Sequence, residues 1–222
     1  MSVDYLVVAS SKRELEGFLT KEHEPVPYAG KLIVFACVGV GNVQAGINTL
    51  DAIYRYQPKA VLGLGYAGGI DPALQIGDGV VATSVVQYDV DLQSFGLKRG
   101  EVFGPQSKQV LGEITLFAPY MEGTRQGKMG SANQFLLRSY REANPWLVDE
   151  LSLVSSDMES YGIALSAVKK EIPCTIFRVV SDDSLGHRPK DYKKFCLQAN
   201  QKFVDFLYKL LESPKEKSPT NL

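Results

Sequence analysis

The sequence predicts an α/β protein, a single domain with three α/β/α layers around a central mixed β-sheet. Apolar runs fit for buried strands alternate along the chain with amphipathic stretches at helical spacing. This rhythm is typical of a mixed or parallel sheet with helices on both faces. A chain of 222 residues is most simply one large domain, because that length is enough for a full hydrophobic core.

The composition is that of an ordinary globular protein and argues against several kinds of partner. Hydrophobic residues make up 45% and charged residues 22%, with a formal net charge of −1. A chain with so small a net charge has no strong electrostatic field that would attract nucleic acid or an anionic membrane. The sequence has no apolar run of about 18 residues and no basic-then-apolar N-terminus. We therefore expect a cytoplasmic protein without a membrane span or a signal peptide.

Metal and disulfide chemistry are not expected either. The cysteines are odd in number and none lies at metal-ligand spacing: Cys37, Cys174 and Cys196. Buried thiols in a reducing compartment explain them best. His23 and His187 are far apart in the chain, which argues against a zinc site.

The first strand is predicted over residues 4–9, which are largely apolar. Ser10 and Ser11 then cap a helix that begins near Lys12, because short side-chain oxygens accept from the free N–H groups of a helix start. Glu14 lies in the first turn, next to the end of the strand, where the helix dipole favours a carboxylate. The apolar face of this helix would consist of Leu15, Phe18 and Leu19.

A second strand–helix–strand unit follows. Residues 32–38 form an apolar strand, and residues 60–70 form another that runs into a glycine-rich stretch. The helix between them covers residues 43–56, with apolar residues at spacings of four, three and four. Its predicted apolar face consists of Val43, Ile47, Leu50 and Tyr54.

The glycine-rich stretch Gly63–Ile70 is not a dinucleotide-binding loop. Asp71-Pro72 follows where such a loop needs a helix, and no Gly-Lys-Ser/Thr ending marks a Walker A loop. Two interpretations stay open. The glycines could let the backbone approach a small ligand, because they have no Cβ in the way, or they could form a tight, closely packed turn.

The middle of the chain predicts two more strands and two more helices. The strands cover residues 77–88 and 126–131, and one helix covers residues 106–120. The other helical run starts at Ser131 or Asn133 and carries Phe135 and Leu136.

A helix that opens on two carboxylates is predicted over residues 158–170, with Ser156 or Asp157 as its N-cap. Residues 174–180 then form a β-rich run that ends in Ser181-Asp182. The buried face of the helix would consist of Tyr161, Leu165 and Val168. In open α/β sheets ligands sit beyond the carboxyl ends of strands, so one pocket is predicted to be faced by Glu159, Arg178 and Asp182.

The chain from Lys190 onward is predicted to be helical and to end in a disordered tail. The apolar stripe of this helix, which should pack in the core, consists of Phe203, Phe206, Leu207, Leu210 and Leu211. Residues 212–219 are polar and interrupted by prolines. We therefore divide the chain into a domain of residues 1–211 and a disordered tail of residues 212–222.

Four motifs, in their order and approximate spacing, resemble the purine nucleoside phosphorylase and nucleosidase superfamily. They are Gly63–Ile70, Gly77–Val81, Asp157–Ser160 and Arg178–Asp182. Within it, the chain is most similar to the 5′-methylthioadenosine/S-adenosylhomocysteine nucleosidases, from the first strand to about Leu211. The resemblance implies a nucleoside phosphorylase-like fold, an N-glycosyl hydrolase activity and a small purine nucleoside as substrate.

The resemblance also implies which residues act on the ribosidic bond. Asp182, supported by Ser181, corresponds to the acid that serves N7 of the departing purine, and Glu14 to the carboxylate that activates water. Asp157 and Arg178 correspond to polar residues that line the water side. General-acid catalysis contributes about 10²–10⁴-fold, and cleavage gives the sugar oxocarbenium character. No metal or organic cofactor is implied.

Five further residues correspond to contacts with the nucleoside. Met158 and Glu159 match the ribose contacts, and Glu159 would hold the 2′- and 3′-hydroxyls because a carboxylate accepts at both oxygens. Phe135 falls where the family stacks an aromatic ring on the base, and Leu136 where a backbone group meets its edge. Tyr66 replaces a small hydroxyl residue, which predicts a reshaped water pocket or 5′ region.

Water is favoured over phosphate as the second substrate. Phosphorolysis needs cationic donors, and the phosphorylases carry an arginine and a serine where this chain has Leu64 and Tyr66. A phosphate-dependent nucleoside phosphorylase nevertheless stays open, since Lys12 and Arg13 are nearby.

The 5′ substituent and the class of protein leave further alternatives. The segment 184–189 is unlike the nucleosidase pattern, which leaves open a futalosine hydrolase, a relative that acts in menaquinone synthesis. His187 and Arg188 leave open a substrate that carries a 5′-phosphate. A non-catalytic nucleoside binder is the alternative of a different class. Members of the superfamily are commonly dimers, so we expect a homodimer in which a neighbouring chain completes the 5′ pocket.

Overall fold

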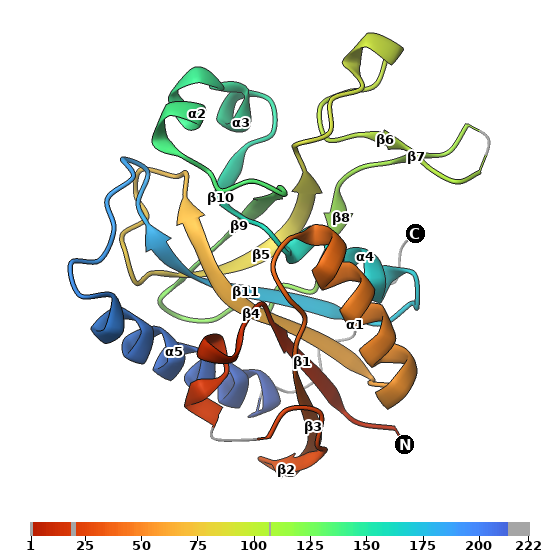
Figure 1. The fold of residues 1–222 in the computed structure, drawn as a ribbon, viewed down its shortest axis with the longest axis vertical. Helices are drawn as coiled ribbons and strands as arrows, with labels where there is room; N and C mark the ends of the chain where they lie inside the picture. Colours follow the sequence, from red (N-terminus) through yellow and green to blue (C-terminus); the bar gives the residue numbers. More distant parts are fainter. Residues whose placement is uncertain (1, 19–20, 107, 213–222) are drawn as a thin grey trace.

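The computed structural model describes residues 2–18, 21–106 and 108–212. A mixed β-sheet runs through the middle of the molecule (Figure 1), in the order β10-β9-β5-β11-β4-β1-β3-β2, with β8 paired to β5. A two-stranded ribbon, β6–β7, projects from this body. The strands are β1 (Tyr5–Ala9), β2 (Val26–Tyr28), β3 (Lys31–Cys37), β4 (Ala60–Gly69), β5 (Gly79–Gln87), β6 (Val102–Phe103), β7 (Val110–Leu111), β8 (Ile114–Thr115), β9 (Thr124–Ser131), β10 (Leu153–Asp157) and β11 (Cys174–Asp182).

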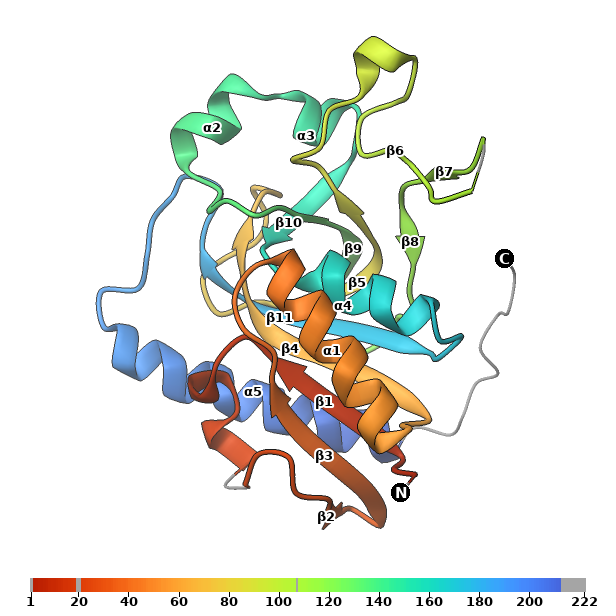
Figure 2. The same ribbon diagram turned by 45° about the vertical axis from the view of Figure 1, so that its right-hand side comes forward.

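Helices cover both faces of the sheet, which confirms the predicted α/β/α class. On one face α1 (Asn42–Tyr56) packs beside α4 (Ser160–Val168), and on the other lies α5 (Tyr192–Glu212), as Figure 1 and Figure 2 show. Two short helices, α2 (Arg138–Ala143) and α3 (Trp146–Asp149), lie near β10. The disordered tail predicted for residues 212–222 lies outside the described residues, apart from Glu212, which ends α5.

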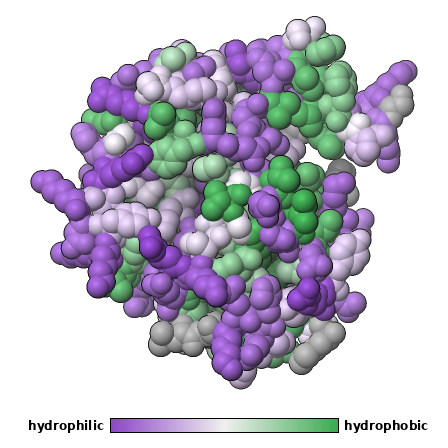
Figure 3. Space-filling view, viewed as in Figure 1, coloured by the Kyte–Doolittle hydropathy of each residue, from purple (hydrophilic) through white to green (hydrophobic). Residues whose placement is uncertain are grey.

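The apolar face predicted for α1 is wrong. Val43 and Ile47 are each 65% exposed and Tyr54 is 62% exposed, and Figure 3 shows apolar side chains gathered near the middle of the face that α1 crosses. Small residues on the opposite side of α1 pack instead against α4. A Cβ at Gly162 would lie 2.2 Å from the carbonyl oxygen of Asn42, so the helices approach too closely for large side chains between them.

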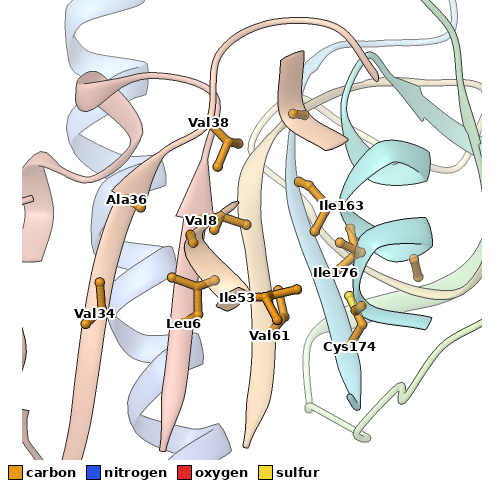
Figure 4. Close-up of a cluster of buried hydrophobic side chains, with 14 of the residues drawn as sticks. Leu6, Val8, Val34, Ala36, Val38, Ile53, Val61, Ile163, Cys174 and Ile176 are labelled. Carbon is orange, nitrogen blue, oxygen red and sulfur yellow. The ribbon is translucent and has the colours of Figure 1, made fainter. Parts of the chain in front are cut away.

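Successive side chains of a strand point to opposite faces of the sheet. The apolar strands therefore build one hydrophobic core on each face. Leu6 and Val8 of β1 belong to the cluster under α1 and α4, where Figure 4 shows Ile163 beside Ile176. Val7 points the other way, into the cluster that α5 closes with Phe203, as the stripe of this helix predicted.

The central strands bring the predicted site residues to one edge of the sheet. Strand β1 is parallel to β3 and β4, and β4 is parallel to β11, so their carboxyl ends meet. Asp182 at the end of β11 is paired with Gly68 near the end of β4. Strand β5 is antiparallel to β11, and β10 is antiparallel to β4, which makes the sheet mixed as predicted.

Two other predicted helices begin differently in the structure. The chain after β1 forms 3-10 turns at Lys12–Glu14 and Glu16–Phe18, because the Glu14 carboxylate folds back onto Ser11. Leu15 and Phe18 are buried as predicted, whereas Leu19 lies outside the described residues. Helix α4 begins at Ser160, and its buried residues extend around most of the helix while Val168 is exposed, because α4 packs both on the sheet and against its neighbour α1.

The helices predicted over residues 106–120 and from Ser131 or Asn133 are also wrong. The first segment contains β7 and β8 and pairs with the sheet, since the N–H of Leu116 donates to the carbonyl oxygen of Thr83 at 2.9 Å. In the second, Asp89 accepts the backbone N–H of Asn133 at 2.6 Å, and this long-range contact holds the chain in an irregular path until α2.

Candidate active site

A cavity of about 230 Å³ opens at the edge of the sheet where β1, β4, β10 and β11 end. The predicted site residues that line it are Glu14, Tyr66, Phe135, Leu136, Asp157, Met158, Glu159, Ser181 and Asp182. Arg178 is fully buried and lies next to it, bound to Asp157. A larger cavity of about 680 Å³ lies along α5 and contains none of these residues.

Two glycines of β4 make room for the carboxylates of this site. A Cβ at Gly68 would lie 2.8 Å from Oδ2 of Asp182, and one at Gly65 would lie 3.0 Å from Oε1 of Glu14. Side chains at these positions would displace the acids. Since β4 continues through Gly69, the glycine-rich stretch is a strand and not the tight turn that was one interpretation.

Glu14 is buried and held by donors on both carboxylate oxygens. Oε2 accepts the Ser10 hydroxyl at 2.6 Å and the Ser11 N–H at 3.0 Å, and Oε1 accepts the Tyr66 N–H at 3.3 Å. Both carboxylate oxygens of Glu14 thus act as hydrogen-bond acceptors. Glu14 is therefore placed as a fixed acceptor at the end of β1.

Asp182 has the opposite electrostatic character. Burial raises the pKa of its carboxyl, while a hydrogen bond from Ser181 and the positive charges of Arg141 and Arg188 lower it by less. The Ser181 hydroxyl donates to Oδ1 of Asp182 at 2.9 Å. The same cavity thus holds one carboxyl that tends to keep its proton and another, Glu14, surrounded by donors.

Glu159 stands between β10 and α4, and its carboxylate accepts the backbone N–H of Gly41 at 3.0 Å. Burial and then the negative charge of Asp157 raise the pKa of Glu159 to about 7, against the opposing effect of Arg178. Gly41 comes directly before α1, so the contact ties Glu159 to a second element of the fold.

Asp157 and Arg178 form a buried ion pair below the cavity, with 2.7 Å between Oδ2 and Nε. Asp157 also accepts the N–H groups of Glu159 and Ser160 and the Ser160 hydroxyl. It therefore satisfies the start of α4 from within β10, whereas the N-cap residue is Glu159 and not, as was predicted, Ser156 or Asp157. Breaking such a pair is costly, since it leaves an uncompensated buried charge.

The ring of Tyr66 packs towards α5, with its centroid 5.3 Å from that of Phe195 and 5.8 Å from that of Phe203. Burial, and to a lesser extent the neighbouring Cys196 thiol, raises the pKa of the Tyr66 hydroxyl. The contact between Tyr66 and Glu14 is made by its backbone N–H. The ring of Tyr66 thus faces α5, while its backbone faces Glu14.

The structure adds residues that the sequence patterns did not identify. Ser10 binds Glu14 through its side chain, and Tyr192 and Val40 line the cavity. Arg141 of α2 donates through Nη1 to the carbonyl oxygens of Asp183, at 3.1 Å, and Ser184. The Arg141 contacts join segments about 40 residues apart, and a local pattern carries no signal for them.

Within residues 2–18, 21–106 and 108–212, no cluster of three or more His, Cys, Asp or Glu side chains is arranged to bind a metal ion. In the same part of the chain, no helix has the length and apolar character needed to cross a membrane.

Comparison with known proteins agrees with this geometry. Residues 7–212 match the model of the phosphorylase superfamily. A 5′-methylthioadenosine/S-adenosylhomocysteine nucleosidase of Marinomonas sp. (strain MWYL1) is 30% identical over 177 residues, which cover 76% of this chain and 75% of the relative.

Solved structures show the same fold. A putative nucleosidase of the same name from Francisella philomiragia has a TM-score of 0.79 and 25% identity, covering 95% of this chain and 99% of the other. The futalosine hydrolase of Helicobacter pylori has a TM-score of 0.76 and 23% identity, covering 94% and 97% of the two chains. The predicted family and fold are confirmed.

Proposed function

We propose that this chain, which belongs to the phosphorylase superfamily, hydrolyses the N-ribosidic bond of a 5′-modified purine nucleoside and releases the free base. One observation carries the proposal. A single cavity holds two carboxyl groups in opposite environments: Asp182, whose pKa is raised by burial, and Glu14, whose oxygens accept from surrounding donors. Such a pair supplies a general acid and a general base at once.

Asp182 acts as the acid at N7 of the leaving purine. A purine leaves poorly as an anion, so a proton delivered to N7 lowers the barrier to cleavage. The raised pKa keeps Asp182 protonated at a higher pH than an exposed aspartate. The Ser181 hydroxyl fixes one carboxyl oxygen, which leaves the other free to face the base.

Glu14 activates the attacking water. Its ionised form can accept a proton, and its position is fixed by Ser10, Ser11 and the backbone of Tyr66. Positioning a nucleophile in this way removes much of the entropic cost of bringing water to the sugar. Glu14 and Asp182 line the same cavity, and the ribosidic bond lies between them in the proposed reaction.

Glu159 and Met158 bind the ribose, and Phe135 stacks on the base. Glu159 lies on the same cavity wall as Asp182 and has one oxygen held by Gly41, so its carboxylate can accept from adjacent sugar hydroxyls. Phe135 is 48% exposed at the mouth of the cavity, which leaves a ring face for a purine. Leu136 is buried behind it and presents its backbone to the base edge.

Water fits this cavity better than phosphate. Phosphorolysis requires cationic donors around the anion, whereas the described lining residues include neither lysine nor arginine. Arg178, the nearest buried cation, is already bound to Asp157. The cavity therefore lacks a phosphate site and favours hydrolysis.

A homodimer is part of the same proposal. Val43, Ile47 and Tyr54 form an exposed apolar stripe on α1, and Val40 at its start is 59% exposed while it also lines the cavity. A second copy seated on this stripe would bury it and would close the cavity next to Val40. Burial of exposed apolar area drives association of this kind.

Purine release tests the proposal. The purified protein is incubated with 5′-methylthioadenosine, S-adenosylhomocysteine, futalosine and inosine, each with and without phosphate, and the free base is quantified. Base release without phosphate is expected, and Asp182→Ala should abolish it. Ligand binding without release from any of these nucleosides would favour a non-catalytic binder, and release only with phosphate would show a phosphorylase.

A further inference from the structure

Two arginines lie over the two aromatic side chains at the mouth of the cavity. The Arg188 guanidinium carbon is 5.0 Å from the ring centroid of Phe135, and that of Arg13 is 5.7 Å from the ring centroid of Tyr192. Phe135 and Tyr192 both line the cavity. Arg188 belongs to the segment that leads from β11 to α5, drawn in blue in Figure 1, and Arg13 follows β1.

Arg13 and Arg188 are both exposed, and neither forms an ion pair in the part of the chain that the structure describes. The remaining arginines each pair with a carboxylate, except Arg141, which donates to backbone carbonyl groups. The cavity mouth thus has two guanidinium groups available for an anion.

The position of each guanidinium group over an aromatic ring favours the binding of an anion. A guanidinium over an aromatic face is held there by a cation–π contact, and those of its N–H groups that have no other partner can donate to an anion. Pairs of guanidinium N–H groups match two oxygens of a carboxylate or phosphate. The interior of the cavity is less suited to an anion, because its described lining includes no lysine or arginine and contains Glu14, the proposed base.

The proposed function indicates which part of the substrate reaches this rim. With the base at Phe135 and Asp182 and the ribose at Glu159, the lining that is left for the 5′ substituent includes Val40 and Tyr192. Tyr192 carries Arg13, and Arg188 lies four residues before it on the same segment. A charged group at the end of a 5′ substituent would therefore leave the cavity at Tyr192, beside Arg13, while Arg188 lies over Phe135 on the base side of the same mouth.

We infer, on the basis of the proposed function, that Arg13 and Arg188 form a cationic rim that recognises an anionic group, a carboxylate or a phosphate, on the 5′ substituent. The rim would then select among nucleosides that share the same base and ribose. It is distinct from the phosphate site of a phosphorylase, because it lies at the mouth of the cavity and not at the carboxylates of the interior.

Matched substrates test this inference. We would compare kcat/KM for 5′-S-(2-carboxyethyl)-5′-thioadenosine with that for its carboxamide, which has the same shape without the charge, and AMP with adenosine as the phosphate arm. The wild type should prefer the charged member of at least one pair by about tenfold, as expected for a hydrogen bond to a charged group. The preference should fall as salt rises, because exposed charges are screened.

Variants of the rim provide the second readout. Arg13→Gln and Arg188→Gln should reduce the ratio of kcat/KM for the charged substrate to kcat/KM for the neutral one towards one. Any effect of Arg188 on Asp182 changes both values equally and cancels in this ratio. Lys190→Gln, which removes an exposed positive charge from the same segment, should keep the ratio. Hydrolysis of both members of each pair at equal kcat/KM, or a preference that survives both arginine substitutions, would overturn the inference. Absence of hydrolysis of every substrate would instead contradict the proposed function.

Discussion

Gly68 and Asp182 are in contact across strands β4 and β11, so closely that a Cβ on Gly68 would lie 2.8 Å from Oδ2 of Asp182. The acid of the site therefore depends on a residue without a side chain in the neighbouring strand. The register of the sheet sets the position of Asp182, and any side chain at position 68 would displace the Asp182 carboxyl group.

Gly68→Ala should lower kcat by at least about tenfold, because the added methyl displaces the acid and one displaced contact of this size costs about 1–3 kcal/mol. The measurement is kcat for base release, with the melting temperature followed in parallel. Gly112→Ala is the control, since its Cβ would lie at ordinary contact distances, the nearest being 3.4 Å to the Glu101 side chain. Equal kcat for Gly68→Ala and wild type would show that Asp182 is not the acid.

Ser10→Ala should weaken catalysis through Glu14. The Ser10 hydroxyl donates to Oε2 at 2.6 Å, and a hydrogen bond to a charged group is worth about 1.5–3 kcal/mol, or a factor of ten or more. We expect kcat to fall by about that factor with little change in KM, since Ser10 holds the base and not the nucleoside. Ser2→Ala, at an exposed serine far from the cavity, should leave both constants unchanged. A change in KM alone would place Glu14 in substrate binding.

Arg141→Met should move the alkaline limb of the pH–rate profile to higher pH. The rate should fall as pH rises through the pKa of Asp182, because the acid loses its proton there. The Arg141 charge lowers that pKa, so its removal should raise it. Arg138→Met on the same helix removes a charge that is bound to Glu142 and should leave the limb in place. A shift to lower pH, or the same shift in both variants, would contradict the role given to Arg141.

Glu159→Gln should make stability less dependent on pH between about 4.5 and 7. The pKa of Glu159 is raised from 4.5 to about 7 in the folded state, so the folded protein binds more protons than the unfolded chain in this window. The stabilisation from this group is fully present below 4.5 and is lost as pH rises through 7. Melting temperatures across this range should decline less with rising pH in the variant. An unchanged pH dependence would mean that Glu159 titrates normally.

Ile47→Asp should dissociate the proposed dimer. Ile47 is 65% exposed in the apolar stripe of α1, and a charge there would have to be buried at the interface. Sedimentation should show a monomer, and base release should fall because the cavity loses its cover beside Val40. Leu197→Asp places the same charge at an equally exposed residue of α5, 65% exposed, and should stay dimeric. A wild-type protein that sediments as a monomer would refute the dimer.

The sequence predicted the fold where local pattern and burial agree. The apolar runs of β1, β4 and β11 became the central strands, and the acids at strand ends met at one edge because those strands are parallel. The face of α1 was predicted wrongly because large apolar residues normally face a core, whereas close contact with α4 required small ones. Asn133 is held by Asp89, a long-range bond that no helical spacing reveals.

The nature of the nucleophile tests the central claim most directly. The protein is incubated with 5′-methylthioadenosine and the other nucleosides in phosphate-free water enriched in ¹⁸O, and the released sugar is analysed by mass spectrometry. The account predicts free base and a sugar that carries one ¹⁸O at C1, with incorporation lost in Glu14→Gln and Asp182→Ala. Base release that appears only when phosphate is added, with a sugar phosphate as product, would contradict it.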